Sequence, residues 1–342
     1  MRPAGGETIG DLGEDALLAR LATVVGAPPP EVVLGIGDDT AVLRAESGKL
    51  LLATCDAQVE GVHFLADAIA PRQLGRRLLA VNLSDIAAMG GTPRWALVSA
   101  VLQADLPAAW LQEFYAGLRE EGDGAGVALV GGNLARSPGP AVIDLTLLGD
   151  VAAEHLLTRS GARPGDALLV TGHLGAAGAG LEVVRQPSLG ARAGAERLLG
   201  AYLTPRPRVR EGQAIGRSRL AHAMMDLSDG LGTDLRRLCA ASGVGARVDV
   251  ARLPVSPEVR AVAAAAGRDP VALALFAGDD YELLVAAPPA AAGALARMLE
   301  AEGTAATVIG EVVEAAAGLT LRDPGGTLRP LEPHGWDHFR HR

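Results

Sequence analysis

Short apolar runs of strand length alternate along most of this chain with segments whose apolar residues recur at helical spacing. Residues 107–121 are predicted to form a helix, because their large apolar side chains fall on one side of it. Residues 71–89 are predicted to form another, since proline suits the first turn and Gly90-Gly91 follow the last one.

The alternation continues in both halves and favours layers of strands and helices, in an α/β or α+β arrangement. The linker-like segment 158–166 lies near the expected boundary between two domains. Further helices are predicted at 14–24, 231–241, 257–266 and 288–302, and one that opens in the glycine-rich stretch 172–180. Strands are predicted at 32–36, 50–54, 95–102, 127–130, 141–148, 167–171, 223–226, 246–250, 282–286 and 307–312.

Composition narrows the class of protein. With 342 residues, of which 49% are hydrophobic, the chain is long enough for two domains with substantial cores. Its formal net charge of −9 argues against general nucleic-acid binding, which needs a basic surface. Cys55 and Cys239 are too few for a disulfide scaffold or a cysteine-rich zinc site. Because no apolar run suggests a signal peptide or a membrane span, we expect a soluble, cytoplasmic protein with no membrane partner.

Five short segments place aspartates beside small residues, at what the pattern predicts to be strand ends or helix starts. Carboxylates are the ligands that hard cations such as Mg²⁺ prefer. The only lysine, Lys49, does not belong to a phosphate-binding P-loop. We therefore expect several divalent ions around a polyphosphate. The segments are G-I-G-D-D-T (35–40), T-C-D (54–56), N-L-S-D (82–85), D-L-S-D-G-L (226–231) and A-G-D-D-Y-E-L (277–283).

Each segment alone also has an ordinary structural interpretation. Aspartate is common in turns, which would explain both G-D-D segments. Asp85 lies in a helical stretch and can face solvent, although a buried carboxylate there would need a partner or a metal. Ser228 or Asp229 can cap the following helix, which explains one acid but not Asp226 and Asp229 together.

Other candidates carry weaker signals. Gly131-Gly132-Asn133 is predicted as a turn after a strand, with an amide oxygen that can ligate a cation weakly. The glycine-rich stretch 172–180 is a weak phosphate signal. Arg159 can hold a phosphate by a bidentate contact, although most arginines cover a surface. His63 gains interest from the nearby carboxylates of T-C-D and Glu60.

Taken in order, the motifs resemble those of the thiamine-monophosphate kinase family, in the superfamily of aminoimidazole-ribonucleotide synthetase and selenophosphate synthetase. The resemblance covers nearly the whole chain. The segments that carry it are Gly13-Glu14, G-I-G-D-D, V-E-G-V-H-F, N-L-S-D-I-A-A-M-G, L-T-R-S-G-A-R-P-G-D, D-L-S-D-G-L, G-D-D-Y-E-L and G-W-D-H-F (335–339).

The resemblance implies a two-domain α/β (α+β) fold like that of aminoimidazole-ribonucleotide synthetase, with N-terminal sheets that pair in a homodimer. It implies an N-terminal domain over 1–150 that binds metal and ATP and dimerises, and a C-terminal α/β domain over 151–342. The resemblance implies a cytoplasmic transferase of thiamine diphosphate biosynthesis. The implied enzyme is a kinase that uses Mg²⁺ and ATP to convert thiamine monophosphate to thiamine diphosphate.

The resemblance also implies a role for each matching residue. The metal positions are Asp39, Thr54, Cys55, Asp56, Asp85, Asn133, Asp226 and Asp229. The nucleotide positions are Gly132, Asn133, Arg159 and Ser228, and the thiamine positions are His63, Asp279 and Trp336.

Three of these positions depart from the family pattern. The family commonly has Asp where this chain has Asn133, so a neutral amide replaces a carboxylate at one metal site. Cys55 replaces a hydroxyl residue, a change that a backbone carbonyl ligand would survive and a side-chain ligand would not. Asp279 replaces Glu, which shortens its reach to the substrate by one methylene.

The expected mechanism follows from charge. The acceptor phosphate is already anionic at neutral pH, so no residue is expected to act as a general base. We expect direct in-line transfer between Mg-bound phosphates, without a phosphorylated protein. The alternatives are another ATP-using enzyme of the superfamily, of the cyclo-ligase type, and a nucleotide- or thiamine-phosphate-binding protein without turnover. V-E-G-V-H-F and G-W-D-H-F argue against the first, and Asn133 is the reason to consider the second.

Overall fold

The computed structural model of the protein describes residues 7, 11, 20, 21, 23–27, 29, 30, 32–34, 42, 43 and 45–332. The chain divides into two compact units. Unit 1 comprises Met1–Ile86 and Thr92–Ala152, and unit 2 comprises Ala87–Gly91 and Ala153–Arg342. The proposed boundary between residues 150 and 151 stays a prediction.

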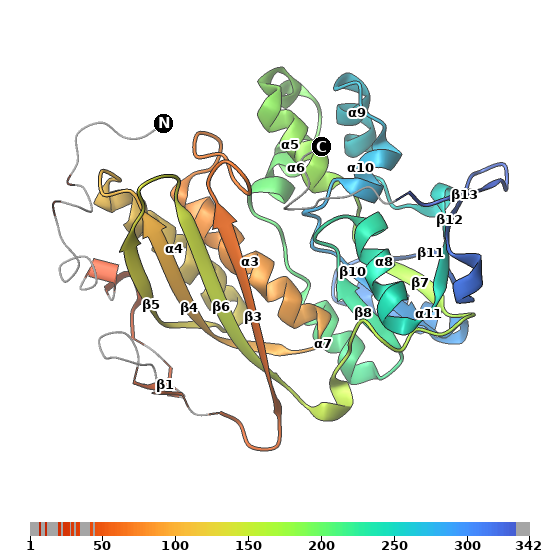
Figure 1. The fold of residues 1–342 in the computed structure, drawn as a ribbon, viewed down its shortest axis with the longest axis horizontal. Helices are drawn as coiled ribbons and strands as arrows, with labels where there is room; N and C mark the ends of the chain where they lie inside the picture. The colour runs from red at the N-terminus through yellow and green to blue at the C-terminus, as the bar shows by residue number, and fades with distance from the viewer. Residues whose placement is uncertain are drawn as a thin grey trace. The chain divides into compact units, whose positions relative to one another are not determined.

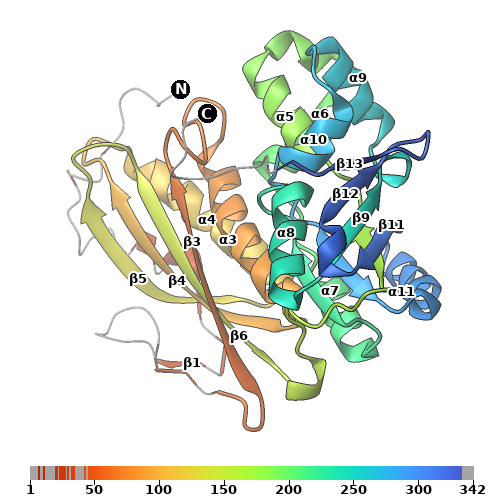
Figure 2. The same cartoon turned by 45° about the vertical axis from the view of Figure 1, so that its right-hand side comes forward.

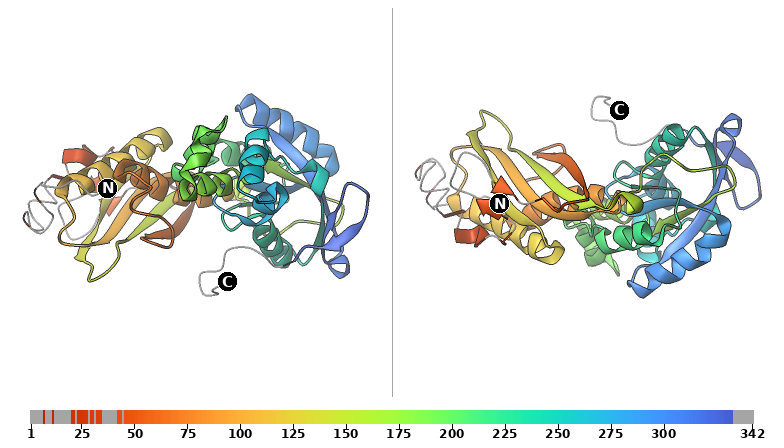
Figure 3. Two further views of the ribbon diagram at one scale, coloured as in Figure 1. Left: turned by 90° about the horizontal axis from the view of Figure 1, so that it is seen from above. Right: turned by 90° about the horizontal axis from the view of Figure 1, so that it is seen from below.

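Unit 1 contains a four-stranded sheet in the order β3-β6-β4-β5, in which only β4 and β5 run parallel to each other. Helices α3 and α4 lie on one side of this sheet (Figures 1 and 3). The strands are β3 (Leu50–Val59), β4 (Thr92–Leu102), β5 (Ala128–Arg136) and β6 (Val142–Val151). The helices are α3 (Pro71–Ala88) and α4 (Ala108–Ala125), and a small separate pair is formed by β1 (Val32–Leu34) and β2 (Val42–Leu43).

The other side of the four-stranded sheet is more open. The side chain of Leu51 on β3 is 63% exposed, and Cys55, four residues later on the same strand, is also exposed. Val32 of β1 packs with Trp95 and Val130. We refer below to the face under α3 and α4 as the helix face of the sheet and to the opposite side as its open face.

Two glycines explain how closely α3 and α4 pack. A Cβ atom on Gly75 of α3 would lie 2.0 Å from the carbonyl oxygen of Phe114 on α4. A Cβ atom on Gly117 of α4 would lie 1.9 Å from the carbonyl oxygen of Arg72 on α3. The two backbones therefore touch, and the shared apolar surface is buried beneath them.

Unit 2 contains a seven-stranded sheet in the order β13-β12-β9-β11-β7-β10-β8. Only β9 and β12 pair in parallel, and β12 and β13 lie at one edge (Figure 2). The strands are β7 (Ala167–Thr171), β8 (Ala223–Asp226), β9 (Gly245–Asp249), β10 (Leu283–Ala287), β11 (Ala306–Val313), β12 (Leu319–Arg322) and β13 (Leu328–Pro330).

Helices cover both faces of this second sheet. Strand residues alternate between two apolar clusters, with Leu168 and Val170 of β7 in one and Ala167 and Leu169 in the other, as the pleat of a strand requires. The first cluster includes residues of α5 (Ala176–Arg185), α6 (Ala195–Leu203), α8 (Leu231–Ser242), α9 (Pro257–Ala265) and α10 (Pro270–Phe276). The second includes residues of α7 (Val209–Ser218) and α11 (Pro289–Ala301).

The predicted mixed layers are confirmed, but several strands are longer than predicted, β3 and β5 most of all. β3 continues through T-C-D, which we expected to end the strand. The predicted turn at Gly131-Gly132-Asn133 is wrong, because β5 continues through it. A Cβ atom on Gly132 would lie 2.0 Å from the carbonyl oxygen of Val98 on β4, so the glycine permits a close approach of two strands.

None of the helices in the described part of the chain combines the length and the apolar character that crossing a membrane requires.

Candidate active site

The first group of expected metal ligands lies between strand β3 and helix α3. Thr54 Oγ1 donates a hydrogen bond of 2.5 Å to Asp85 Oδ2. Gln58, further along β3, accepts a hydrogen bond of 3.2 Å from Arg77 of α3. Because alternate residues of a strand share a face, Asp56 lies on this same helix face, between Thr54 and Gln58. Strand β3 and helix α3 therefore place the hydroxyl of Thr54 and the carboxylates of Asp56 and Asp85 on the helix face, where their oxygens can act as ligands.

Cys55 lies on the open face of the same strand. Its Sγ atom is 3.1 and 3.3 Å from the two carboxylate oxygens of Asp144 on β6. The hydrogen bond to Asp144, followed by partial burial, raises the pKa of the Cys55 thiol. The thiol cannot reach the face that carries Asp56, so Cys55 has only its backbone carbonyl to offer as a ligand there.

Asn133 also lies away from Asp56. Asn133 of β5 is opposite Ser99 of β4, and Ser99 is opposite Asp144 of β6. Residues that pair across strands point to the same face, so Asn133 shares the open face with Cys55. Two strands separate β3 from β5, which places the two edges about 14 Å apart at the usual strand spacing. Asn133 and Asp56 therefore lie at opposite edges and on opposite faces of this sheet.

His63 is held in a turn that follows β3. Its Nδ1 accepts a hydrogen bond of 3.0 Å from the N–H of Val59, so the neutral ring carries its proton on Nε2. The carboxylate of Glu60 anchors this turn by accepting hydrogen bonds of 2.9 Å from Gln103 and from the N–H of Ala141. The turn therefore presents a half-buried imidazole with a defined tautomer.

In unit 2, the segments D-L-S-D and G-D-D-Y-E lie side by side. The N–H of Asp279 donates to the carbonyl of Ser228 at 2.7 Å, and the N–H of Tyr281 donates to the carbonyl of Leu227 at 2.9 Å. The first segment follows β8 and the second precedes β10, and these two strands pair with each other. Segments that are about fifty positions apart in sequence thus form one site, which contains Asp226, Ser228, Asp229 and Asp279.

A carboxylate that the sequence did not single out lies beneath this site. Asp234 of α8 is fully buried and accepts hydrogen bonds from the N–H of Asp229 at 3.0 Å and from Arg237 at 2.8 Å. Arg237 also lies 2.6 Å from the Asp229 carboxylate. Burial, followed by the charges of Asp226 and Asp229, raises the pKa of Asp234 to about 7. The expected cap by Ser228 or Asp229 is absent, because α8 begins after Gly230 without a side-chain cap.

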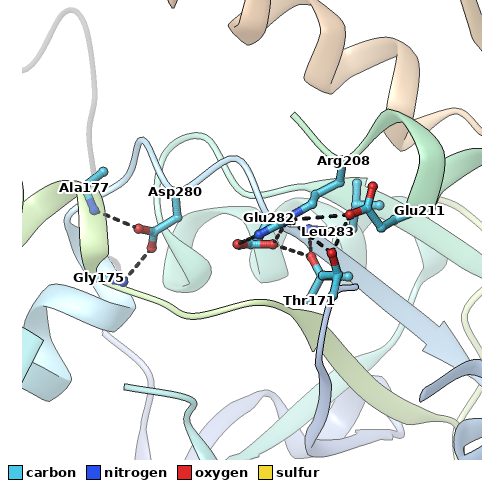
Figure 4. A network of polar contacts seen from close by, with 9 residues as sticks. Thr171, Gly175, Ala177, Arg208, Glu211, Asp280, Glu282 and Leu283 are labelled. Carbon is cyan, nitrogen blue, oxygen red and sulfur yellow. Dashed lines mark hydrogen bonds and ion pairs between the residues drawn. The ribbon is translucent and has the colours of Figure 1, made fainter. Parts of the chain in front are cut away.

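Two N–H groups at the glycine-rich start of α5 are already bound to a carboxylate of the protein. Those of Gly175 and Ala177 donate to the Asp280 carboxylate at 2.7 and 3.2 Å (Figure 4). Burial of this carboxyl, opposed by the two N–H donors, raises the pKa of Asp280 to about 7. The protein's own carboxylate thus occupies the anion-binding position of this helix.

Arg159 lies in the exposed segment before β7, and its backbone is fixed by α8. The Ser242 hydroxyl donates to the carbonyl of Arg159 at 2.9 Å and accepts from the N–H of Ala162 at 3.2 Å. The backbone of Arg159 is therefore fixed, while its guanidinium group lies at an exposed position where it can bind a phosphate.

Comparison with known proteins decides the family. Residues 37–151 match the family described as AIR synthase related protein, N-terminal domain, and residues 163–321 match the corresponding C-terminal domain. Thiamine-monophosphate kinase of Escherichia coli (strain K12) is 39% identical over 96% of this chain and 98% of that protein. The chain belongs to the thiamine-monophosphate kinase family. This confirms the fold class and the family that the order of motifs indicated.

Solved structures of the thiamine-monophosphate kinase family agree with the assignment. The crystal structure of the enzyme from Stenotrophomonas maltophilia K279a is 35% identical, covers 91% of this chain and 96% of its own, and superposes with a TM-score of 0.80. A structure described as AaThiL complexed with AMPPCP and TMP is 33% identical, covers 96% and 98%, and has a TM-score of 0.76.

The donor atoms fit a magnesium-dependent member of this family. Among the described residues, no three His, Cys, Asp or Glu side chains form a ready-made metal cage. Magnesium does not need one, since it usually takes one or two carboxylates and completes its shell with waters and substrate phosphates. Asp56 and Asp85 in unit 1, and Asp226 and Asp229 in unit 2, supply that kind of partial shell.

Two residues that the family resemblance marks, Asp39 and Trp336, lie outside the described residues. Conversely, the structure shows carboxylates that support the site and that sequence reasoning missed. Asp280 and Glu282 stand in a motif that we quoted, but the motif does not indicate which acids point inward. Asp234 gives no sequence signal beyond an acid in the first turn of a helix.

Proposed function

We propose that this protein transfers the γ-phosphoryl group of ATP to thiamine monophosphate, giving thiamine diphosphate and ADP. Membership of the thiamine-monophosphate kinase family carries the proposal, since the match extends over 96% of the chain. The related structure described as complexed with AMPPCP and TMP supports the same pair of substrates.

In this reaction the bond between the γ-phosphorus of ATP and the oxygen bridging it to the β-phosphorus breaks. A bond from the γ-phosphorus to a phosphate oxygen of thiamine monophosphate forms, and ADP leaves. The attacking oxygen is already anionic, so no side chain has to remove a proton. The remaining obstacle is repulsion between two anions, together with the alignment of the reacting atoms.

The carboxylates would reduce this repulsion by binding cations that lie between the phosphates. In unit 1, we assign Asp56, Asp85 and Thr54 to Mg²⁺, and in unit 2 Asp226 and Asp229. When bound, Mg²⁺ neutralises charge on the phosphates. The further metal positions implied by the family are Asp39, the Cys55 carbonyl and Asn133.

The remaining site residues are assigned to the organic parts of the substrates and to the nucleotide phosphates. His63 would donate through Nε2, because Nδ1 already accepts from Val59. The residues assigned to thiamine monophosphate are His63, Asp279 and Trp336, and those assigned to ATP are Gly132, Asn133, Arg159 and Ser228.

A coupled ADP-release assay with ATP, Mg²⁺ and thiamine monophosphate tests this function. We expect ADP release that requires thiamine monophosphate and is abolished by EDTA, with thiamine diphosphate as the product. Release only with a different acceptor would favour another reaction of the superfamily. Binding of both substrates without ADP release would favour a protein without turnover, the interpretation that Asn133 suggests.

We further propose that two copies of the chain pair through the sheet of unit 1. Among the residues that the structure describes, β3 and β5 form the two edges of this sheet, and an exposed edge strand is a template for pairing with another chain. The open face beside the β3 edge carries exposed Leu51, and Leu50 next to it is 45% exposed. Apolar surface of this kind on a sheet is typical of an interface.

A further inference from the structure

The turn that carries Asp279 has an unusual backbone. Asp279 and Tyr281 have φ angles of 62° and 49°, next to Gly278 at 74°. Arg219, at the end of α7, is the only other residue besides glycine with a positive φ among those described. Residues with a Cβ atom avoid this region, and they remain there only where surrounding contacts hold them.

Two carboxylates supply those contacts from the residues on either side of Tyr281. Asp280 is bound by the N–H groups of Gly175 and Ala177 at the start of α5. Glu282 is almost fully buried and accepts hydrogen bonds of 2.5 and 2.6 Å from Arg208 (Figure 4).

Glu282 is fixed on its other side as well. It accepts a hydrogen bond of 2.6 Å from the hydroxyl of Thr171, the last residue of β7, and that hydroxyl accepts from the N–H of Leu283. A Cβ atom on Gly172 would lie 2.0 Å from a carboxylate oxygen of Glu282, so the group fills the space over this glycine. The turn is thereby tied to strand β7 as well as to helices α5 and α7.

The third contact acts on the Asp279 side chain itself. The Tyr281 hydroxyl donates a hydrogen bond of 3.1 Å to Asp279 Oδ1. Tyr281 is only 7% exposed, so the position of its ring is fixed by packing. The backbone of Asp279 is bound to Ser228 in the adjacent segment, and the hydroxyl of Tyr281 sets the rotation of its carboxylate.

We propose that Tyr281 and Asp280 are positioning residues for substrate recognition by Asp279. Asp280 holds the strained turn against α5, and Tyr281 aims the carboxylate of Asp279 at the cationic heterocycle of the acceptor. The inference rests on the proposed function, in which Asp279 contacts thiamine monophosphate. The orientation of the carboxylate is more critical for Asp279 than it would be for a glutamate. Aspartate has one side-chain torsion fewer, so its carboxylate has less freedom to adjust to the substrate.

Tyr281→Phe tests the proposal with little disturbance, since it removes one hydroxyl and keeps the ring. Tyr202→Phe is the matched control, because Tyr202 is 8% exposed and lies on α6, outside this turn. We expect Tyr281→Phe to raise the KM for thiamine monophosphate roughly tenfold, the scale of one hydrogen bond to a charged group. The KM for ATP, kcat and the melting temperature should stay close to those of the wild type and of Tyr202→Phe.

Asp280→Asn is the second variant, with Asp269→Asn as its control. Asp269 also accepts a backbone N–H at a helix start, from Val271 at 3.0 Å, but it does not belong to the turn. Asp280→Asn should raise the KM for thiamine monophosphate more than the KM for ATP, and Asp269→Asn should raise neither. Equal increases of both KM values would mean a general structural role and would overturn the proposal, as would an unchanged KM in Tyr281→Phe.

Calorimetric titration with thiamine monophosphate separates this inference from the proposed function. If the wild type binds the compound but releases no ADP, the function fails, and the inference is decided by whether Tyr281→Phe weakens binding about tenfold. If the wild type does not bind thiamine monophosphate at all, both proposals are overturned.

Discussion

At the scale of single residues, the pairing of Asp85 with Thr54 defines the candidate metal site of unit 1. The hydroxyl and the carboxylate are 2.5 Å apart, and Asp56 lies on the same face of the strand. Their oxygens converge from a strand and a helix whose positions are fixed by a close-packed apolar layer. We therefore propose that Asp56 and Asp85 bind the same Mg²⁺ ion, and substitution of either residue tests this.

Asp56→Asn and Asp85→Asn should each lower kcat/KM by roughly 10²- to 10³-fold, the scale of losing one electrostatic stabiliser of the transition state. Both changes keep side-chain size and remove a charge. Asp123→Asn is the control, because that carboxylate is 70% exposed on α4. Steady-state kinetics at several Mg²⁺ concentrations provide the measurement, and near-full activity of Asp56→Asn would contradict the assignment.

The raised pKa of Asp280 predicts a dependence of stability on pH. Its pKa is about 7 in the folded protein, against an ordinary value of 3.8, so the folded state holds the proton more tightly. This contribution to stability is complete below about pH 4 and is lost as the pH rises through 7. The melting temperature of the wild type should therefore exceed that of Asp280→Asn by more at pH 5 than at pH 8. A difference that grows with pH would contradict this sign.

Sequence reasoning singled out most of the residues that we propose to carry chemistry, but not the residues that hold them in place. Asp226, Asp229 and Asp279 could be singled out because their short motifs occur in a recognisable order. Asp280 and Asp234 could not, since their importance comes from hydrogen bonds to segments far away in sequence. The same limit applies to Cys55, whose orientation depended on the length of strand β3.

At the scale of elements, the contact between α3 and α4 determines how unit 1 presents Asp85. Gly75→Ala should destabilise the unit by about 1–3 kcal/mol, the usual cost of overpacking, because the new methyl would overlap a carbonyl oxygen of α4. Gly124→Ala on α4 is the control, since nothing lies within 4 Å of its added Cβ atom, and it should be neutral or stabilising. Urea unfolding, followed by the fluorescence of Trp95 and Trp110, measures the free energy of unfolding of both variants.

A Gly75→Ala protein as stable as the wild type would show that the two helices can separate without cost. The approach of α3 to α4 would then not fix the position of Asp85.

The elements that could be predicted are those with an unambiguous pattern. β7 and β8 occupy the predicted residues, because both are continuous apolar runs buried on two faces. β3 and β5 extend beyond their predicted ends because polar residues of an edge strand can face solvent on one side. Helices α6 and α7 were not predicted, although their sequences carry a helical pattern: α6 buries Ala195, Leu198, Tyr202 and Leu203 at helical spacing, a signal that sequence reasoning missed.

At the scale of the whole molecule, the proposed pairing of two copies gives a direct prediction. Leu51→Lys would place a charge on the open face beside the β3 edge, and we expect it to convert a dimer into a monomer in sedimentation experiments. Leu328→Lys is the control, because Leu328 is also exposed, at 48%, but lies in unit 2. If Leu51→Lys leaves the dimer intact, the pairing does not use this edge.

The family assignment could be obtained from sequence, because it depends on the order of motifs rather than on their geometry. The separation of Asn133 from Asp56 shows what sequence cannot provide. We propose both residues as metal ligands from the family resemblance, yet strand order puts them at opposite edges and on opposite faces of one sheet. Pairing across strands is a tertiary property that neither motif encodes.

Transfer of label from [γ-³²P]ATP is the measurement that tests the central claim most directly. The protein is mixed with labelled ATP, Mg²⁺ and thiamine monophosphate, and the reaction is quenched within a single turnover. We predict that the label appears in thiamine diphosphate without ever being found on the protein, and that Asp56→Asn and Asp85→Asn slow its appearance. Label on the protein, or an absence of labelled thiamine diphosphate, would contradict direct transfer between the two substrates.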